Sequence, residues 1–290
     1  MIPSALFLRV AVPLIARLPL RMSRWAARGA GTAGYLLAGT RRRTLLANHR
    51  ALAPDADSGE LRRRVRRTFL NLCDAAVDLL RLPSIAPDAI RRLITVDGLQ
   101  HLEAAIATGY GVVIVTPHLG PYELGGAWMA LEGYPVHAMV EDLAPDDGAA
   151  MARLRTATGM RLLSRDRGTR EALRLLRERQ LLLLVADRVV GHGAPGLAVP
   201  FGAGRRRIPL GPAALALATG APIVVGHIAR AKTGPARYRI TLEPPIHPLT
   251  TDDVHADRER LTRQVGARLA ALVEAHPDQW FVFQPEWLPA

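Results

Sequence analysis

The segment 111–126, G-V-V-I-V-T-P-H-L-G-P-Y-E-L-G-G, decides the fold of this 290-residue chain. Its apolar run over residues 111–116 is typical of a strand buried on both faces, and the Gly-Pro pair that follows begins a helix. His118 therefore lies at the C-terminal end of a predicted strand, where open α/β sheets bind their ligands. Glu123 follows in the first turns of the predicted helix.

Short apolar runs alternate with helical patterns on both sides of this segment. The predicted strands cover 93–96, 111–116, 135–140, 181–186, 223–228 and 238–242. The predicted helices cover 98–108, 121–132, 146–158, 168–179, 210–219 and 254–275, and Ser58 is a candidate N-cap for a helix that ends before Pro83. This alternation predicts an α/β fold with a mixed, mainly parallel sheet flanked by helices, in one domain over residues 58–290.

The composition suits a folded protein with an uneven distribution of charge. Hydrophobic residues make up 49% of the chain and charged residues 22%, which excludes a disordered class. The single cysteine, Cys73, excludes an internal disulfide framework and favours a cytosolic or cytosol-facing location. The net charge is +12, and residues 1–92 hold 17 Arg against 6 acidic residues. The basic surplus therefore belongs to the first third of the chain.

Two apolar, Arg-studded segments begin the chain. Residues 1–20 are interrupted by Arg9 and Arg17, with a bend expected at Pro13, and residues 22–39 repeat the pattern. A membrane-spanning helix needs about 20 mostly uncharged residues, so these segments are better suited to lie in the membrane interface.

We therefore expect residues 1–57 to form basic amphipathic helices that dock on an anionic membrane surface. Neutralising Arg17, Arg21 and Arg24 is then expected to weaken vesicle binding while the fold stays intact. The alternative is ordinary amphipathic helices packed on the domain, because apolar periodicity alone does not separate the two.

The segment 29–34, G-A-G-T-A-G, matches the dinucleotide-binding pattern G-x-G-x-x-G. That motif requires a preceding strand, whereas the preceding residues here are Arg-rich and helical in pattern. Close helix packing or a small-residue turn is the favoured interpretation of these glycines.

A histidine at the end of a strand has two interpretations. A neutral imidazole takes a proton from a hydroxyl, and a carboxylate on its other nitrogen fixes the tautomer. Because His118 precedes the helix, the chain can fold Glu123 back toward its ring. A purely structural histidine is the alternative.

The pattern H-x-x-x-x-E over 118–123, together with the Arg run 41–43, Ala186-Asp187-Arg188, the segment 199–202 and the terminal segment 277–281, resembles a known family. The chain is similar to bacterial glycerolipid-type acyltransferases, in the branch of the lipid A late acyltransferases and the phosphatidylinositol mannoside acyltransferase. The resemblance implies a glycerolipid acyltransferase-like fold. It also implies transfer of a fatty acyl group from acyl-CoA or an acyl carrier protein to a hydroxyl of a membrane lipid or glycolipid.

In that family His118 would be the general base and Glu123 its orienting partner, without a covalent acyl-enzyme. No cofactor beyond the thioester co-substrate is implied, and the expected location is the cytoplasmic face of a bacterial inner membrane. The sequence departs from the family pattern at Pro200-Phe201-Gly202 and at Gln284-Pro285-Glu286-Trp287, which leaves the identity of the acceptor open.

Further polar residues are candidates for substrate binding. Glu141 resembles the family acid that orders the site, and Arg155 and Arg188 are suited to a phosphate or sugar hydroxyl. For Arg155, a solvated helix face is the alternative. Asp187 comes directly after a buried strand, where burying its charge costs free energy unless the carboxylate is paired or takes part in binding or catalysis. The run Arg205–Arg207 suits an anionic headgroup or carrier protein, and we select Arg205 and Arg207 as candidates; a solvated loop is the alternative.

Competing functions remain at this stage. Water in place of the acceptor would make the protein a thioesterase or lipid hydrolase, and a non-catalytic lipid-binding protein is a third possibility. Nucleic-acid binding is disfavoured because aromatic residues make up only 5% of the chain. No H-x-x-x-H, C-x-x-C or H-E-x-x-H spacing occurs, so no metal is expected.

Overall fold

A seven-stranded sheet forms the centre of the protein in a computed structural model that describes residues 5–190 and 195–288. Its strand order is β1-β9-β8-β2-β5-β3-β4. Every neighbouring pair is parallel except β8 and β9. The predicted mixed, mainly parallel α/β sheet is therefore confirmed.

Most strands coincide with the apolar runs of the sequence. The sheet contains β1 (Ile94–Asp97), β2 (Val112–Thr116), β3 (Val136–Val140), β4 (Arg161–Ser164), β5 (Leu181–Val185), β8 (Ile223–Arg230) and β9 (Tyr238–Leu242). A separate antiparallel hairpin contains β6 (Gly196–Phe201) and β7 (Gly204–Pro209). The sequence prediction omitted β4, a four-residue strand at the edge of the sheet, and the hairpin, in which Pro200 lies within the apolar run of β6 and three arginines occupy β7.

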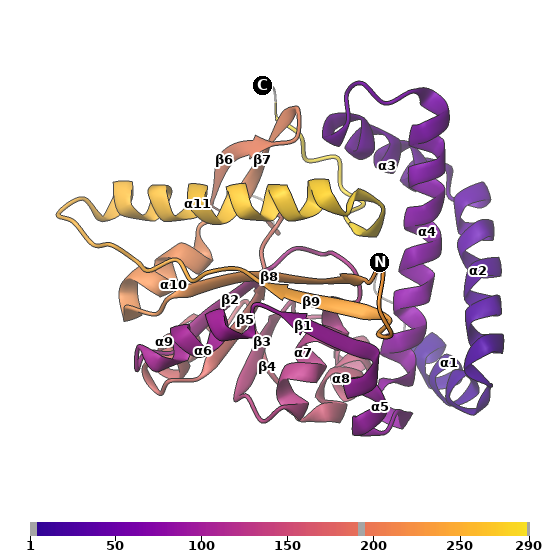
Figure 1. The fold of residues 1–290 in the computed structure, drawn as a ribbon, viewed down its shortest axis with the longest axis horizontal. Helices are drawn as coiled ribbons and strands as arrows, with labels where there is room; N and C mark the ends of the chain where they lie inside the picture. The colour runs from indigo at the N-terminus through magenta and orange to yellow at the C-terminus, as the bar shows by residue number, and fades with distance from the viewer. Residues whose placement is uncertain (1–4, 191–194, 289–290) are drawn as a thin grey trace.

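Helices cover both faces of the sheet, so strand side chains alternate between two hydrophobic cores. Val113 and Val115 of β2 pack in one core, with residues of α9 (Thr169–Arg177), α10 (Gly211–Thr219) and α11 (Val254–Ala275). Val112 and Ile114 pack in the other, with residues of α5 (Pro87–Leu93), α6 (Leu99–Ala107) and α7 (Tyr122–Leu131). Figure 1 shows α11 running along one side of the sheet.

The long helix α4 (Ser58–Arg81) lies at one end of the sheet, between the sheet and the first two helices (Figure 1). Packed against it are α1 (Ala5–Arg17), which continues through Pro13, α2 (Leu20–Leu37) and α3 (Gly39–Leu52). The N-cap of α4 is Asp57, which accepts a hydrogen bond from the Glu60 amide at 2.8 Å, so the choice of Ser58 was wrong by one residue. The division at residue 57 stays a prediction.

The remaining helices of the described residues are one α-helix and three short 3₁₀ helices. They are α8 (Pro145–Arg155) and the 3₁₀ helices η1 (Leu82–Ser84), η2 (Thr156–Thr158) and η3 (Pro277–Gln279).

The close approach of α2 and α4 explains the glycine-rich segment. A Cβ atom on Gly31 would lie 3.0 Å from the Leu70 Cα and 3.0 Å from the Phe69 carbonyl oxygen. A Cβ atom on Gly29 would have nothing within 4 Å. The segment lies inside α2, which confirms helix packing as the interpretation of the motif.

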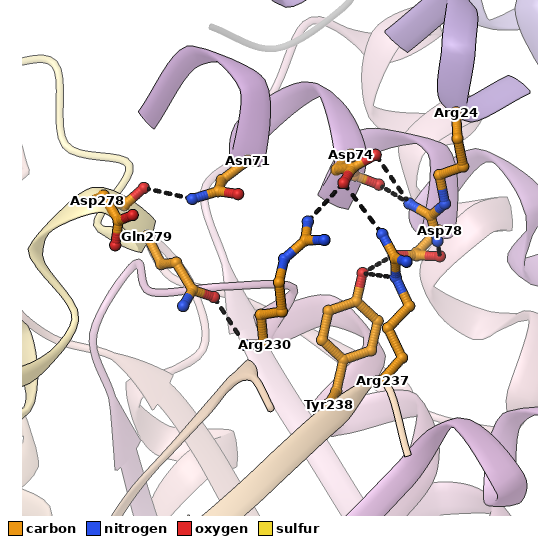
Figure 2. Close-up of polar contacts among 9 residues, drawn as sticks. All are labelled: Arg24, Asn71, Asp74, Asp78, Arg230, Arg237, Tyr238, Asp278 and Gln279. Atoms are coloured by element: carbon orange, nitrogen blue, oxygen red, sulfur yellow. Dashed lines mark hydrogen bonds and ion pairs between the residues drawn. The ribbon is translucent and has the colours of Figure 1, made fainter. Parts of the chain in front are cut away.

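An ion network joins α4 to the sheet and to α2 (Figure 2). The Asp74 carboxylate accepts hydrogen bonds from Arg230 at 2.5 Å and from Arg237 at 3.0 Å. Asp78, one turn further along α4, accepts from Arg24 and from the hydroxyl of Tyr238. Both carboxylates are buried, so the network anchors α4 on the ends of β8 and β9.

Arg24 is the contribution of α2 to this network. Its guanidinium donates to the Asp74 carbonyl oxygen at 2.6 Å and pairs with Asp78, and its side chain is only 11% exposed. The grouping of Arg24 with Arg17 and Arg21 on a docking surface is therefore corrected: Arg24 points into the protein, while the other two are exposed.

The outer faces of α1 and α2 carry exposed apolar side chains. These are Leu6, Phe7, Val10, Leu14, Leu20, Met22, Trp25, Leu36 and Leu37. Trp25 is 80% exposed and Leu37 is 84% exposed. Arg9, Arg17, Arg21 and Arg28 are exposed on the same two helices. In the part of the chain that the structure describes, no helix is long and apolar enough to cross a membrane.

Candidate active site

The carboxyl ends of three neighbouring parallel strands gather the candidate residues. His118 follows β2, Asp187 follows β5 and Glu141 follows β3. These strands are adjacent in the order β2-β5-β3, so their ends meet at one edge of the sheet. The predicted position of the site, at the C-terminal ends of the strands, follows from this topology.

His118 and Asp187 form a direct hydrogen-bonded pair. The imidazole Nδ1 lies 2.5 Å from Asp187 Oδ1, and the His118 backbone N–H donates to Oδ2 at 3.1 Å. The indole Nε1–H of Trp280 also donates to Oδ2, at 2.7 Å. The carboxylate is completely buried, whereas the His118 side chain is 17% exposed. Asp187 thus holds the ring from its buried side.

These contacts keep Asp187 ionised. Burial by itself raises the pKa of the Asp187 carboxyl, but the charge of His118 and the hydrogen bonds from His118 and Trp280 outweigh burial and hold the pKa at about 2. An ionised carboxylate accepts a proton donor on Nδ1, which leaves the lone pair on Nε2. Within residues 5–190 and 195–288, no hydrogen bond engages Nε2, so this nitrogen is available as a base.

The loop that carries His118 is held by the C-terminal segment. Gly120 adopts φ +59°, and a Cβ atom there would lie 2.0 Å from the Ile228 carbonyl oxygen, so only glycine fits. The Gly120 N–H donates to the Gln279 carbonyl at 2.8 Å, and the Phe281 N–H donates to the His118 carbonyl at 2.8 Å. Gln279 in turn accepts from the Arg230 backbone N–H at 2.8 Å, which links the loop to the network of Figure 2.

Glu123 has a different partner from the one expected. Its carboxylate accepts from Arg155 Nε at 3.0 and 3.1 Å and from Nη2 at 2.7 Å, in a forked ion pair. The expectation that Glu123 orients His118 is corrected, because Asp187 takes that position. The reason is the helix geometry: Glu123 lies in the first turn of α7, where it meets Arg155 at the last position of α8.

A second ion pair lies at the same edge of the sheet. Arg188 Nη2 is 3.1 Å from Glu141 Oε1, and Arg165 Nη1 is 3.8 Å from the same oxygen. The Tyr122 ring contacts His118 edge to face, with centroids 5.6 Å apart. Tyr122 also lies within electrostatic reach of the Glu123–Arg155 pair, Asp187 and Arg188. The structure therefore brings together His118, Glu123, Glu141, Arg155, Asp187 and Arg188.

Arg205 and Arg207 lie apart from this group, on the hairpin. Both side chains are exposed on β7, and Arg205 Nη2 donates weakly to the Ala198 carbonyl at 3.4 Å. No described contact joins them to His118 or Asp187, and their role in binding stays a prediction.

Sequence reasoning missed the contributions of Trp280 and Arg206. Trp280 is 1% exposed, and its indole N–H donates a hydrogen bond to Asp187. The two residues are 93 positions apart, so their contact depends on the tertiary fold. Both interpretations of the Arg205–Arg207 run, an anionic-ligand cluster or a solvated loop, place Arg206 at the surface, whereas its side chain is 1% exposed. The available signal was the hairpin itself, because alternation along a strand turns the middle of three arginines inward.

Covalent catalysis finds no support in the one cysteine. Cys73 lies on α4, where burial, with a smaller contribution from Asp74, raises the pKa of its thiol. Among the described residues, no group of three or more His, Cys, Asp or Glu side chains is arranged to hold a metal ion.

Comparison with known proteins gives the family. A model described as bacterial lipid A biosynthesis acyltransferase matches residues 4–289. The phosphatidylinositol mannoside acyltransferase of Mycobacterium tuberculosis (strain ATCC 25618 / H37Rv) is 30% identical over 218 residues, which are 73% of this chain and 66% of that protein. The protein of the same name from Mycolicibacterium smegmatis is 26% identical over 216 residues, 73% of this chain and 68% of that protein.

Among solved structures, the 1-acyl-sn-glycerophosphate acyltransferase PlsC from Thermotoga maritima aligns with a TM-score of 0.38 at 15% identity, over 80% of this chain and 96% of that one. The match to the M. tuberculosis protein spans just under two thirds of its length. Because the family model covers nearly every residue, the chain belongs to the bacterial lipid A biosynthesis acyltransferases.

Proposed function

We propose that this protein transfers a fatty acyl group from an acyl thioester to a hydroxyl of a membrane glycolipid, with His118 as the general base. The observation that carries the proposal is the His118–Asp187 pair, in which Nδ1 is 2.5 Å from a buried carboxylate. A base held in this way at the open edge of an α/β sheet suits deprotonation of a bound hydroxyl. The names of the family and of its relatives support lipid acyl transfer.

The proposed reaction proceeds without an acyl-enzyme. His118 Nε2 takes the proton of the acceptor hydroxyl while the oxygen attacks the thioester carbonyl carbon. The tetrahedral intermediate then expels the thiolate as the C–S bond breaks, and the imidazolium returns the proton to sulfur. Asp187 stays ionised throughout and stabilises the imidazolium.

The two ion pairs beside His118 are proposed to bind the acceptor. Arg155 and Arg188 side chains are each 17% exposed and each paired with a carboxylate, Glu123 or Glu141. A paired guanidinium keeps donors that are fixed in direction, which suits a phosphate or a sugar hydroxyl. Acyl-CoA and acyl carrier protein remain the two candidate donors, and exposed Arg205 and Arg207 suit the phosphates of either.

We further propose that α1 and α2 rest on the cytoplasmic face of a bacterial plasma membrane. The apolar stripe with Trp25 and the exposed Arg9, Arg17, Arg21 and Arg28 match an anionic lipid surface. In this arrangement the lipid acceptor reaches the site from the membrane, while the water-soluble thioester approaches from the cytosol.

The test is acyl transfer in lipid–detergent micelles with palmitoyl-CoA and phosphatidylinositol mannoside, followed by mass spectrometry. We expect an acylated glycolipid, with release of CoA that depends on the acceptor. His118→Ala is expected to lower the rate by roughly 10²- to 10⁴-fold. His255→Ala, which removes a side chain that is 70% exposed on α11, is the matched control and should keep the wild-type rate.

Two outcomes would overturn this proposal. Free fatty acid formed at a rate independent of any lipid acceptor would make the protein a thioesterase. Wild-type activity in His118→Ala would remove His118 from the mechanism. If phosphatidylinositol mannoside is inert, comparison of the membrane lipids of a deletion strain with those of its parent identifies the acceptor by the acylated species that is lost.

A further inference from the structure

A buried arginine lies behind the catalytic pair. Arg206 is in the middle of β7, where alternation exposes Arg205 and Arg207 and turns Arg206 inward, so that its side chain is 1% exposed. Its Nε, Nη1 and Nη2 atoms are all buried and make no hydrogen bond to any described residue. The nearest carboxylate oxygen, from Glu286, is 3.8 Å away. Burying a cation without hydrogen bonds costs free energy of folding, so we ask what function the Arg206 charge serves.

Three aromatic rings surround this guanidinium. Its Cζ atom lies 5.1 Å from the Trp280 centroid, 5.1 Å from the Trp287 centroid and 6.0 Å from the Phe201 centroid. We call Phe201, Trp280 and Trp287 the aromatic cage. The negative faces of the rings attract the cation and replace part of its lost hydration. The Trp287 indole is fixed by its hydrogen bond to Asn48 Oδ1 at 2.7 Å, so α3 holds the cage in place.

Trp280 connects the cage to the catalytic pair. One face of its ring carries Arg206, while its Nε1–H donates to Asp187 Oδ2 at 2.7 Å. Asp187 in turn binds His118 Nδ1 at 2.5 Å. The cation is thus separated from the catalytic carboxylate by a single aromatic ring, and its field acts on Asp187.

We infer that Arg206 is a positioning residue whose charge, acting through Trp280 and Asp187, sets the pH range in which His118 works as a base. The inference rests on the proposed function. A buried carboxylate so close to an imidazole favours the protonated ring, which cannot accept a proton from the acceptor. A fixed cation behind the carboxylate offsets part of its field and so keeps a larger fraction of His118 neutral.

Other charged groups face the same residues. Arg188 and Glu286 act on Arg206 together with Asp187, and Glu123, Arg155 and Tyr122 lie on the His118 side. Arg188 and Arg155 are each neutralised by a carboxylate at 3.1 Å or closer. Arg206 has only the more distant Glu286, which leaves its charge the least compensated of the three.

The test is the dependence of kcat/KM for acyl transfer on pH. Removing the cation in Arg206→Met should move the midpoint of the acid limb to higher pH by roughly 0.5–1 unit. Arg206→Lys keeps the charge and should keep the midpoint near that of the wild type. Glu286→Gln removes the opposing charge and should move the midpoint in the other direction, to lower pH.

Arg263→Met is the matched control, because it removes an arginine that is 58% exposed on α11 and should leave the midpoint unchanged. A purely structural role for Arg206 would lower kcat/KM equally at every pH, and that result would overturn the inference. If Arg206→Met does not fold, the midpoint measured for Glu286→Gln tests the inference instead. Glu286 is 41% exposed, so this variant is expected to fold. A midpoint that does not fall in that variant would also overturn it.

The same variants separate this inference from the proposed function. The titration of the His118 ring, followed by ¹⁵N NMR and assigned with His118→Gln, needs no substrate. If the wild type transfers no acyl group, the proposed function fails, while the order of the ring midpoints, Arg206→Met above wild type above Glu286→Gln, still tests the role of Arg206.

Discussion

The completely buried carboxylate of Asp187 accepts three hydrogen bonds. This surplus of donors keeps the carboxylate ionised and fixes the plane of the His118 ring. Glu123, five residues from His118, is instead committed to Arg155. The orientation of His118 therefore depends on Asp187, which lies 69 positions further along the chain.

Replacement of Asp187 by Asn should lower kcat/KM for acyl transfer by roughly 10²- to 10⁴-fold, because the amide no longer selects the correct tautomer. In the His118→Ala background, the same replacement should cost almost nothing further, since the two residues act as one unit. Rates of the two single variants and the double variant check this prediction. Independent, multiplying losses would show that Asp187 acts without His118.

How much of the site the sequence predicts depends on the separation of its parts. His118 and Asp187 each follow a continuous apolar run, so both were placed correctly at strand ends. Their pairing depends on β2 lying next to β5, which one strand alone does not reveal. The short interval from His118 to Glu123 suggested that the two side chains are partners. Glu123 instead lies in the first turn of α7 and pairs with Arg155.

At the scale of the elements, the close contact between α2 and α4 gives a direct test of the helical packing. Gly31→Ala should lower the free energy of unfolding by about 1–3 kcal/mol, because its Cβ would meet backbone atoms of α4 at 3.0 Å. The Cβ atom of Gly29→Ala would have no atom within 4 Å, so this variant should raise the free energy of unfolding by roughly 0.5–1 kcal/mol through helix propensity. Urea unfolding of both variants gives the comparison. Equal effects would contradict the packing.

The network on α4 predicts a pH dependence of stability. Burial by itself raises the pKa of the Asp74 carboxyl. The hydrogen bond from Arg230 and the charges of Arg24, Arg230 and Arg237 outweigh burial and hold this pKa below 3.8. The stabilisation from a depressed pKa is complete above the unfolded value and is lost as the pH falls through the folded value.

Asp74→Asn should therefore lower the free energy of unfolding by roughly 1–3 kcal/mol at pH 7, and the deficit should shrink below about pH 4. Denaturant titrations of wild type and variant from pH 3 to 7 measure this difference. A deficit that stays constant or grows toward acid pH would contradict the assignment of the stabilisation to the Asp74 charge.

At the scale of the whole molecule, charge and apolar exposure coincide on the N-terminal helices. The inner sides of α1–α3 pack on α4, while the outer sides of α1 and α2 keep Trp25 and a row of leucines exposed. The two interpretations of these helices, packed on the domain or docked on a membrane, are therefore compatible with each other. Arg24 shows why single arginines cannot be assigned from the sequence, because its inward direction depends on the partners that α4 offers.

The triple variant Arg17→Gln, Arg21→Gln, Arg28→Gln should weaken binding to vesicles that contain phosphatidylglycerol by roughly 10²-fold at low salt, since each arginine near the surface contributes about 1 kcal/mol. The control variant changes exposed Arg167, Arg170 and Arg177 to Gln and should bind as the wild type does. Vesicle co-sedimentation measures both. Equal weakening in the two variants would indicate a general effect of net charge.

The most direct measurement of the central claim is the low-field ¹H NMR signal of the His118 Nδ1 proton. We predict that this signal is present in the wild type and in Glu123→Gln, and absent from Asp187→Asn, because Asp187 holds the ring at 2.5 Å. Loss of the signal in Glu123→Gln and its survival in Asp187→Asn would contradict the assignment of Asp187 as the partner of His118.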